Sequence, residues 1–338
     1  MSMSTIRMRD IMALVVVAAI LIAMIPTMVL TGLARAADNG TIDVDFQTGT
    51  SPPTVDNVTL WDNTTTIENP PMTPLVEYVI RVKVTDGATF DNLTTVKVTL
   101  YRDGDGVYNT SDRPTVSDNS QSCAIFTWTK AGSFSIDKPS GSTWELVGAD
   151  CPAPNLGIST GNFDFHFKAG KVAQESTSGS AEWHIYAVAD DGADQNSGYR
   201  TGEEMNWYGE ISVGGPVHIG TINLGYTDKQ SPAFSNTYIA NGTYTRAVSA
   251  STTWTGSTVN LGLVTGTPGA SQFALKADED TNPSDATPIS GTYTSVGSSH
   301  SITGDTGDPI SNYLFLSLGS TGVPNGTYSG YVYYEIHS

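Results

Sequence analysis

Acidic residues gather in the stretch YRDGDGVYNTSDRP, which spans residues 101–114. Asp103, Asp105 and Asp112 place three carboxylates close together, and Asn109 adds an amide oxygen. Like charges at this spacing repel one another, and a hard cation among them relieves the repulsion. Val107 adds a backbone carbonyl oxygen, which calcium also accepts as a ligand. The spacing therefore predicts a calcium site formed by Asp103, Asp105, Val107, Asn109 and Asp112.

When Asp105-Gly106 is aligned with a central Asp-Gly, this stretch resembles the calcium loops of EF-hand and dockerin proteins. It departs from them at the first loop position, where Tyr101 offers no carboxylate, and at the twelfth, where Asp112 is shorter than the usual glutamate. A strand is expected before the loop instead of a helix. The departures predict weak binding, in the range of about 10⁻⁴–10⁻³ M typical of extracellular modules. A solvated acidic hairpin loop without an ion is the alternative interpretation.

A second acidic turn, ADDGADQN, places Asp190, Asp191 and Asp194 directly after an expected strand. Three carboxylates in one turn could hold a cation for the same electrostatic reason. The turn lacks the complete spacing of a calcium loop. We therefore treat it as a possible second cation site, with a solvated turn as the alternative.

The N-terminus has the pattern of a secretion signal. Arg7 and Arg9 precede an apolar run over residues 11–33, and the small-x-small sequence Ala34-Arg35-Ala36 follows. Residues 1–36 are predicted to be a signal peptide. The apolar run is also near the length that spans a bilayer, so an uncleaved membrane anchor over residues 11–33 is the alternative. Both interpretations predict that the remainder is extracellular or displayed at the cell surface.

Two further sequence features fit an extracellular location. Cys123 and Cys151 are the only cysteines, and outside the cytoplasm they are expected to form a disulfide. The chain also contains Asn-x-Ser/Thr sequons, which are candidate glycosylation sites. The sequon asparagines are Asn39, Asn57, Asn63, Asn92, Asn109, Asn241 and Asn325.

Period-two alternation of apolar and polar residues dominates the sequence after residue 37. In LVEYVIRVKV, which spans residues 75–84, alternate apolar residues from Val76 to Val84 share one face and charged residues share the other. In FDFHF, Phe163, Phe165 and Phe167 are expected to point inward. Such alternation is typical of half-buried strands, and no segment keeps helical spacing over three turns. The sequence predicts an all-β fold.

Gly-Gly-Pro within SVGGPVHIG marks a boundary between two expected domains. We predict an acidic β-sandwich that carries the calcium loop over residues 37–214, and a smaller β-sandwich over residues 215–338, each Ig-like or jelly-roll-like. The chain has 16 basic and 34 acidic residues and a formal net charge of −18. That sign excludes nucleic acid as an expected partner.

The second half contains IANGTYTRAVSAS and, near its end, VPNGTYSGYVYYEI. In these stretches it resembles S-layer-like and adhesin-like β-sandwich modules of secreted prokaryotic surface proteins. The resemblance implies a structural or binding role without a catalytic centre. It also implies other surface proteins, further copies of the chain or glycans as partners.

Residues with catalytic potential are scattered along the chain. The five histidines show no metal-ligand spacing, and no nucleophile elbow, phosphate loop or dinucleotide fingerprint is present. We therefore expect a non-enzymatic protein, such as an S-layer-like component or a filament subunit. A carbohydrate-binding protein is the alternative, if aromatic residues are exposed instead of packed in the core. The candidates are Trp61, Trp144, Trp207, Tyr208, Tyr331, Tyr333 and Tyr334.

The sequence TIDVDF at residues 41–46 alternates Ile42, Val44 and Phe46 with two aspartates. This pattern makes it a competent strand, and a loop rich in Thr, Gly and Pro follows it. Such a strand can complete its own sheet or the open edge of a neighbour's sheet. The second arrangement would assemble copies of the chain into a polymer.

Overall fold

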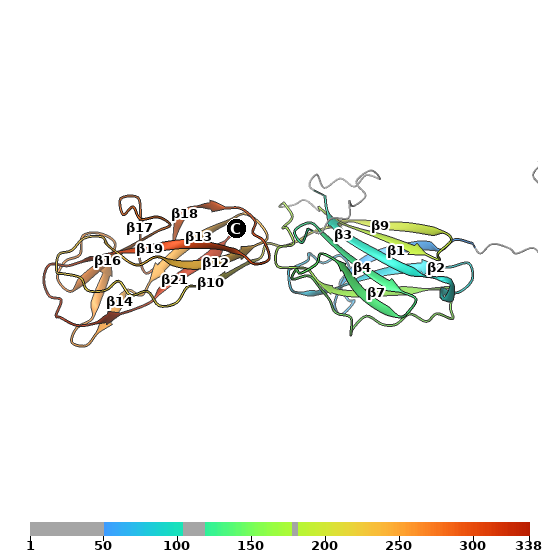
Figure 1. Cartoon of the computed structure of the whole chain (residues 1–338), viewed down its shortest axis with the longest axis horizontal. Helices are drawn as coiled ribbons and strands as arrows, with labels where there is room; N and C mark the ends of the chain where they lie inside the picture. The colour runs from blue at the N-terminus through green and yellow to red at the C-terminus, as the bar shows by residue number, and fades with distance from the viewer. Residues whose placement is uncertain (1–50, 104–118, 178–181) are drawn as a thin grey trace, which may run out of the picture. The chain divides into compact units, whose positions relative to one another are not determined.

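The computed structural model describes residues 51–103, 119–177 and 182–338 of the chain (Figure 1). Across these ranges the secondary structure is almost entirely β, and the sole helical element is the 3₁₀ turn η1 (Phe90–Asn92). The all-β prediction is confirmed. The predicted signal or anchor, the strand at residues 41–46 and most of the predicted calcium loop lie outside the described residues.

The first half of the described chain forms two antiparallel sheets. Their strands are β1 (Thr54–Asp62), β2 (Glu77–Thr85), β3 (Thr95–Arg102), β4 (Cys123–Thr129), β5 (Ser133–Lys138), β6 (Glu145–Leu146), β7 (Thr160–Lys168), β8 (Trp183–Asp190) and β9 (Gln195–Glu203). One sheet has the order β1-β2-β7-β6, and the other has the order β5-β4-β3-β8-β9. The two sheets pack face to face as a β-sandwich.

Aromatic side chains from both sheets fill the space between them. Phe163, Phe165 and Phe167 of β7 are fully buried, as the alternation in FDFHF predicts. The ring of Trp128 from β4 lies 4.9 Å from that of Phe163, and the ring of Phe126 lies 5.3 Å from that of Phe167. Burying rings of this size removes a large apolar area from water, which makes this cluster the main stabilising feature of the first half.

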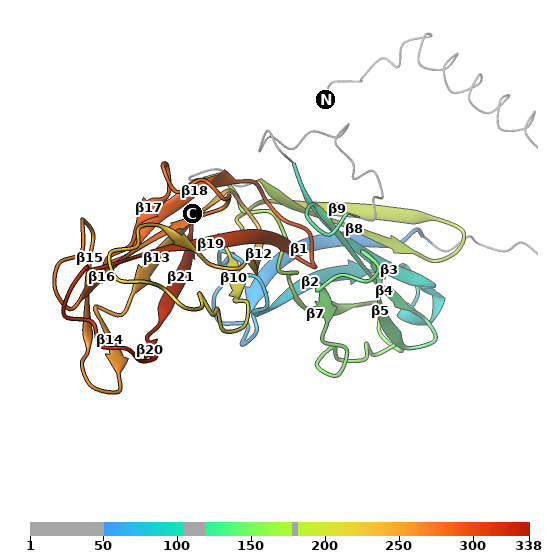
Figure 2. The same cartoon turned by 60° about the vertical axis from the view of Figure 1, so that its left-hand side comes forward.

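The second half also forms two sheets. Its strands are β10 (Gly209–Ser212), β11 (Lys229–Gln230), β12 (Phe234–Ala240), β13 (Tyr244–Ala250), β14 (Thr253–Gly256), β15 (Leu261–Val264), β16 (Gln272–Asp278), β17 (Thr287–Pro288), β18 (Thr294–His300), β19 (Asp308–Leu318), β20 (Tyr328–Ser329) and β21 (Val332–His337). The larger sheet follows the path β10-β12-β19-β16-β15-β14-β20, with β11 beside β19 and β17 beside β16. The smaller sheet has the order β18-β13-β21 (Figures 1 and 2).

Apolar residues from both of these sheets meet in a separate core. Val248 of β13 and Val296 of β18 pack with Leu275 of β16 and with Leu314 and Leu316 of β19. The second half is therefore also built as a two-layer sandwich. The core of the first half and the apolar clusters of the second share no residue.

β10 belongs to the second half, because its residues pair with β12 from Gly209↔Ala240 to Ser212↔Thr237. It lies before the Gly-Gly-Pro sequence at the predicted domain boundary. The apolar cluster of the first half reaches Met205, and Trp207 packs with the second half. The domain limit at residues 214 and 215 stays a prediction.

The predicted disulfide is wrong, because Cys123 and Cys151 are buried thiols that are not joined to each other. Cys123 begins β4 and pairs with Tyr101 in the five-stranded sheet. Cys151 lies in the loop before β7, and its sulfur accepts a hydrogen bond from the backbone N–H of His166 at 3.3 Å. Each thiol is thus held against a different sheet of the sandwich.

Within the described ranges, no helix has the length and apolar character needed to cross a membrane.

Candidate binding face

The smaller sheet of the second half presents one side to the core and the other to solvent. On β21, Val332 and Tyr334 pack toward the core, and Ile336 packs beside Tyr238 and Tyr244. Because successive side chains of a strand point to opposite faces, the residues between them point outward. Tyr333 lies opposite Ser249 of β13, and Glu335 lies opposite Ala247. We call this outward side, with Tyr331, Tyr333, Glu335 and His337 along β21, the tyrosine face.

Tyr331 and Tyr333 are the most prominent side chains of the tyrosine face. They are 71% and 45% exposed, and their ring centroids lie 6.2 Å apart with a 34° angle between the planes. Ala247 and Ser249 of the neighbouring strand are small and buried beside them. Exposed aromatic rings next to small residues form a surface that another molecule can contact without first displacing long side chains.

The core side of the same sheet is anchored by Arg246 of β13. Its guanidinium forms an ion pair with Glu279, donates to Asn312 Oδ1 at 3.1 Å and lies over the ring of Tyr238 at 5.4 Å. Arg246 is only 1% exposed. A buried charge is tolerated only when it is paired in this way, so the contacts fix the position of β13 under the face.

The tyrosines on the two sides of this sheet differ in their electrostatic surroundings. Burial raises the pKa of Tyr244 to about 12. Burial is also the main cause that raises the pKa of Tyr334 above its ordinary value. The raised pKa values reflect the burial of these two inner hydroxyls among packed side chains, whereas Tyr331 and Tyr333 face water.

The other aromatic residues singled out from the sequence do not join this face. Trp144 is buried in the core of the first half, where it stacks near Phe167. Trp61 is half-buried and donates from Nε1 to Thr59 Oγ1 at 2.8 Å. Trp207 packs against the apolar cluster around Tyr238. Tyr208 is half-buried and donates to Glu210.

Asp103 is the one predicted calcium-site residue that the structure describes. Its backbone N–H donates to Glu182 O at 2.7 Å, and its carboxylate lies 3.9 Å from His184 Nε2. The other predicted ligands, Asp105, Val107, Asn109 and Asp112, lie outside the described residues. The calcium site stays a prediction.

The second acidic turn uses its carboxylates to cap its own backbone. Asp190 Oδ1 accepts from Gly192 N at 2.6 Å, and Asp191 Oδ1 accepts from Ala193 N and Asp194 N at 2.8 and 2.7 Å. These backbone donors hold the pKa of Asp191 below its ordinary value. The turn therefore has a structural role, and its use as a cation site stays a prediction.

The structure brings together three acidic residues that sequence reasoning did not single out. Single carboxylate oxygens of Asp278, Asp280 and Asp285 lie within 4.8 Å of one another at the end of β16. The signal in the sequence was the stretch DEDTNPSD, where the acids share one loop. Asp280 also accepts from Asn282 N at 2.7 Å, which shows that the loop folds back on itself.

The sequon asparagines fall into three groups. Asn57, Asn63, Asn92 and Asn325 are exposed. Asn39 and Asn109 lie outside the described residues. Asn241 is fully buried, and its amide donates to Ala173 O at 2.7 Å and to Asn206 O at 2.9 Å. A glycan cannot be attached to that nitrogen in this conformation, because both of its hydrogens are engaged and no surface is open.

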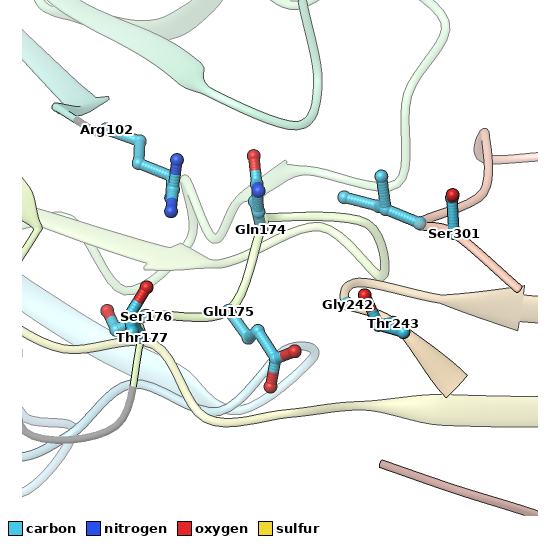
Figure 3. Close-up of a pocket in the computed structure, with 9 residues that line it drawn as sticks. Arg102, Gln174, Glu175, Ser176, Thr177, Gly242, Thr243 and Ser301 are labelled. Carbon is cyan, nitrogen blue, oxygen red and sulfur yellow. The ribbon is translucent and has the colours of Figure 1, made fainter. Parts of the chain in front are cut away.

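A polar cavity of ≈ 580 Å³ lies near Asn241. Figure 3 shows its lining, which comes from the end of β3, residues 174–177 and the turns at Gly242 and Ser301. Burial raises the pKa of Glu175, and the nearby charge of Arg102 opposes that rise. A side chain at Gly242 would collide with the Glu175 carboxylate. The lining is mostly hydroxyl, amide and charged groups, so the cavity suits water or a small polar molecule.

Comparisons with protein-family models and with curated proteins find no match for this chain.

Proposed function

We propose that this chain is a non-enzymatic extracellular surface protein with a structural or adhesive role. The tyrosine face is its contact surface. The N-terminal signal pattern supports the location, and two β-sandwiches support a scaffold that presents surfaces. The protein acts by holding other molecules at the cell surface.

The exposure of Tyr331 and Tyr333 is the observation that carries this proposal. Tyr333 stands on β21, which is paired to β13 over its length, and Tyr331 directly precedes that strand, where its carbonyl oxygen accepts from Ser251 N at 2.9 Å. Tyrosine supplies large contact area with little loss of side-chain entropy, and for this reason it is enriched at binding surfaces. Rings placed on a strand are also held more precisely than rings on a loop.

A binding assay on whole cell envelopes tests this role. Purified protein in its naturally processed form should bind envelope fragments, and the double variant Tyr331→Ser/Tyr333→Ser should bind at least about tenfold more weakly. Tyr226→Ser is the matched control, because Tyr226 is 47% exposed but lies between β10 and β11. Equal binding by all three proteins would reject the tyrosine face as the contact surface.

Carbohydrate binding is the second candidate function. It is favoured by the distance of 6.2 Å and the modest tilt between the Tyr331 and Tyr333 rings. Two neighbouring rings can stack against the apolar faces of successive sugar units. The face carries one acidic residue, Glu335, and the chain as a whole is strongly acidic, so a neutral oligosaccharide fits better than an anionic one.

Calorimetry with neutral oligosaccharides separates the two candidates. A sugar-binding face should give heat of binding that is lost in Tyr331→Ser/Tyr333→Ser and retained in Tyr331→Phe/Tyr333→Phe, because stacking requires the ring and not the hydroxyl. Envelope binding without any oligosaccharide response would favour the structural or adhesive role.

Calcium binding at Asp103–Asp112 is part of the same proposal. Millimolar calcium should raise the melting temperature of the protein, because an ion bound only to the folded state stabilises that state. Asp105→Ala should remove the increase, whereas Asp150→Ala, at an exposed acidic residue outside both candidate cation sites, should leave it in place. An unchanged melting temperature in calcium would reject the site.

A further inference from the structure

β21 is an edge strand whose second side has no strand partner in the described part of the chain. It pairs with β13 alone, in the order β18-β13-β21, and β10 of the larger sheet lies near β21 without forming a ladder with it. An edge of this kind presents a row of unpaired backbone donors and acceptors, which is a template for another strand.

The register shows which backbone groups face this open side. Ser251 N donates to Tyr331 O at 2.9 Å, toward β21, whereas Ala250 N donates to Ser290 O at 2.9 Å on the opposite side of β13. Hydrogen-bonding direction alternates along an antiparallel strand. The backbone groups of Tyr331, Tyr333 and Glu335 therefore point toward β13. Those of Val332, Tyr334 and Ile336 point toward the open edge.

Other edges in the described sheets carry features that discourage pairing. β6 and β20 are two residues long, and β10 has four residues. β1 has an irregularity in its register with β2, and β9 has one in its register with β8. β18 contains Gly297 with a φ of 70° next to a register shift with β13. β5 ends at a Lys-Pro sequence. Short length, irregularity, Lys and Pro are the usual protections of edge strands.

β21 has none of these protections. Its six residues, VYYEIH, pair with β13 without a register shift and include no Pro, Gly or Lys. It is also rich in β-branched and aromatic residues, which favour strand pairing. An unprotected edge in a soluble domain indicates a partner that covers it.

We propose that the β21 edge pairs with β21 of a second copy of this chain, in antiparallel orientation about a two-fold axis at Tyr334. The two three-stranded sheets then become one continuous sheet. This inference names the partner for the structural role and so rests on the proposed function.

Self-pairing about Tyr334 places compatible side chains opposite each other on both the core side and the tyrosine face of the combined sheet. Tyr334 pairs with Tyr334 of the second copy, and Val332 pairs with Ile336 of the second copy. These three residues are the ones whose backbone groups point toward the open edge. On the tyrosine face, Tyr333 lies opposite Glu335, and Tyr331 lies opposite His337. A phenol hydroxyl can donate to the carboxylate, and no two like charges stand opposite each other.

Neighbouring registers are less favourable. An axis at Glu335 sets the two copies of that carboxylate against each other, which is destabilising. An axis at Tyr333 leaves Ile336 opposite residue 330, outside the strand. The axis at Tyr334 keeps five of the six residues of β21 paired within the strand.

Sedimentation equilibrium of the naturally processed protein tests this dimer. The expected result is a monomer–dimer equilibrium in which Tyr333→Glu weakens association at least about tenfold, because each new carboxylate faces Glu335 of the other copy. Tyr333→Glu/Glu335→Lys should restore association, since opposite charges then face each other. Tyr293→Glu is the matched control, because Tyr293 is also exposed but precedes β18 at the far edge of the same sheet.

A protein that remains monomeric at all concentrations would overturn the proposal. If Tyr333→Glu/Glu335→Lys associates no more strongly than Tyr333→Glu, the register with its axis at Tyr334 is wrong. Both positions are exposed, so the variants should keep the melting temperature of the parent protein at concentrations where the parent is monomeric. Envelope binding is measured separately, so a failed dimer and a failed adhesive role give different results.

Discussion

Arg200 donates from Nε to Oε1 of Glu203 at 2.6 Å, at a point where Glu203 is only 1% exposed. In the amide orientation that satisfies its hydrogen bonds, the Asn69 side-chain nitrogen donates to both carboxylate oxygens of Glu203. Burial raises the pKa of Glu203 to about 7, although Arg200 opposes the rise. Desolvation therefore outweighs the attraction of the guanidinium at this site.

This relationship predicts that stability falls as pH rises from about 4.5 to about 7. Between these values the unfolded chain releases the Glu203 proton while the folded chain retains it, so ionisation favours unfolding. The loss is at most about 3–4 kcal/mol, at about 1.4 kcal/mol for each unit of pKa difference. Urea unfolding over this pH range measures the slope. Glu203→Gln should flatten it, and the neighbouring exposed Glu204→Gln should leave it unchanged.

Asn241 is predicted to be essential for the connection between residues 173–176 and 206–208. Besides its two donated hydrogen bonds, its Oδ1 accepts from Tyr208 N at 2.7 Å. Asn241→Ala would leave three backbone groups unpaired, at a cost of about 1–3 kcal/mol for each buried group. Urea denaturation should show a loss of several kcal/mol, whereas Thr243→Ala, which removes the sequon and keeps Asn241, should show little change.

The same burial predicts that Asn241 carries no glycan. Mass spectrometry of peptides from protein secreted by its native cell should find Asn241 unmodified even where exposed sequons such as Asn57 or Asn325 are occupied. A glycan on Asn241 in folded protein would contradict the structure.

Both cysteines are predicted to react with thiol reagents only after unfolding. Cys123 and Cys151 are buried, and burial raises the pKa of the Cys151 thiol, which lowers the fraction of reactive thiolate. Alkylation without a reductant should add two groups to each denatured chain and none to the folded chain. If the denatured chain takes up no reagent, the two cysteines are joined in a disulfide and the structure is wrong on this point.

Arg246 is predicted to stabilise the second half more than a surface ion pair does. Arg246→Met keeps the volume but removes the guanidinium that pairs with Asn312 and Glu279, at a cost of about 1–3 kcal/mol. Lys276→Met is the matched control, because its 3.1 Å pair with Asp228 is partly exposed and should be worth less than about 1 kcal/mol. Equal losses in urea denaturation would show that burial of the Arg246 pair adds nothing.

Much of the fold was predictable because alternation reports burial directly. Tyr78, Ile80, Val82 and Val84 are buried as their period-two spacing predicts. Val79 is buried as well, although it points to the opposite face of β2. Val76 precedes the strand and is exposed. The pattern identifies the core face well, but it does not show what covers the other face.

The pairing of distant segments was not predictable from the sequence. Nothing in the local sequence around Cys123 and Cys151 shows that the two residues lie against different sheets. The tyrosine face was predictable in part, since alternation in VYYEI separates Tyr331 and Tyr333 from Tyr334. The acidic group at Asp278, Asp280 and Asp285 depends on how its loop folds back, and spacing along the chain does not reveal this.

The position of β13 between β18 and β21 also determines when the second half can fold. Its register aligns Thr245 with His337, and these residues are 92 positions apart. Pairing residues so far apart in the chain loses conformational entropy of the intervening loop before the stabilising contacts form. Folding of this half should therefore be slow. During synthesis or export, β13 must wait for β21 to emerge. The cell therefore handles an incomplete sheet until the residues between β13 and β21 have emerged, and a chaperone can bind it in that interval.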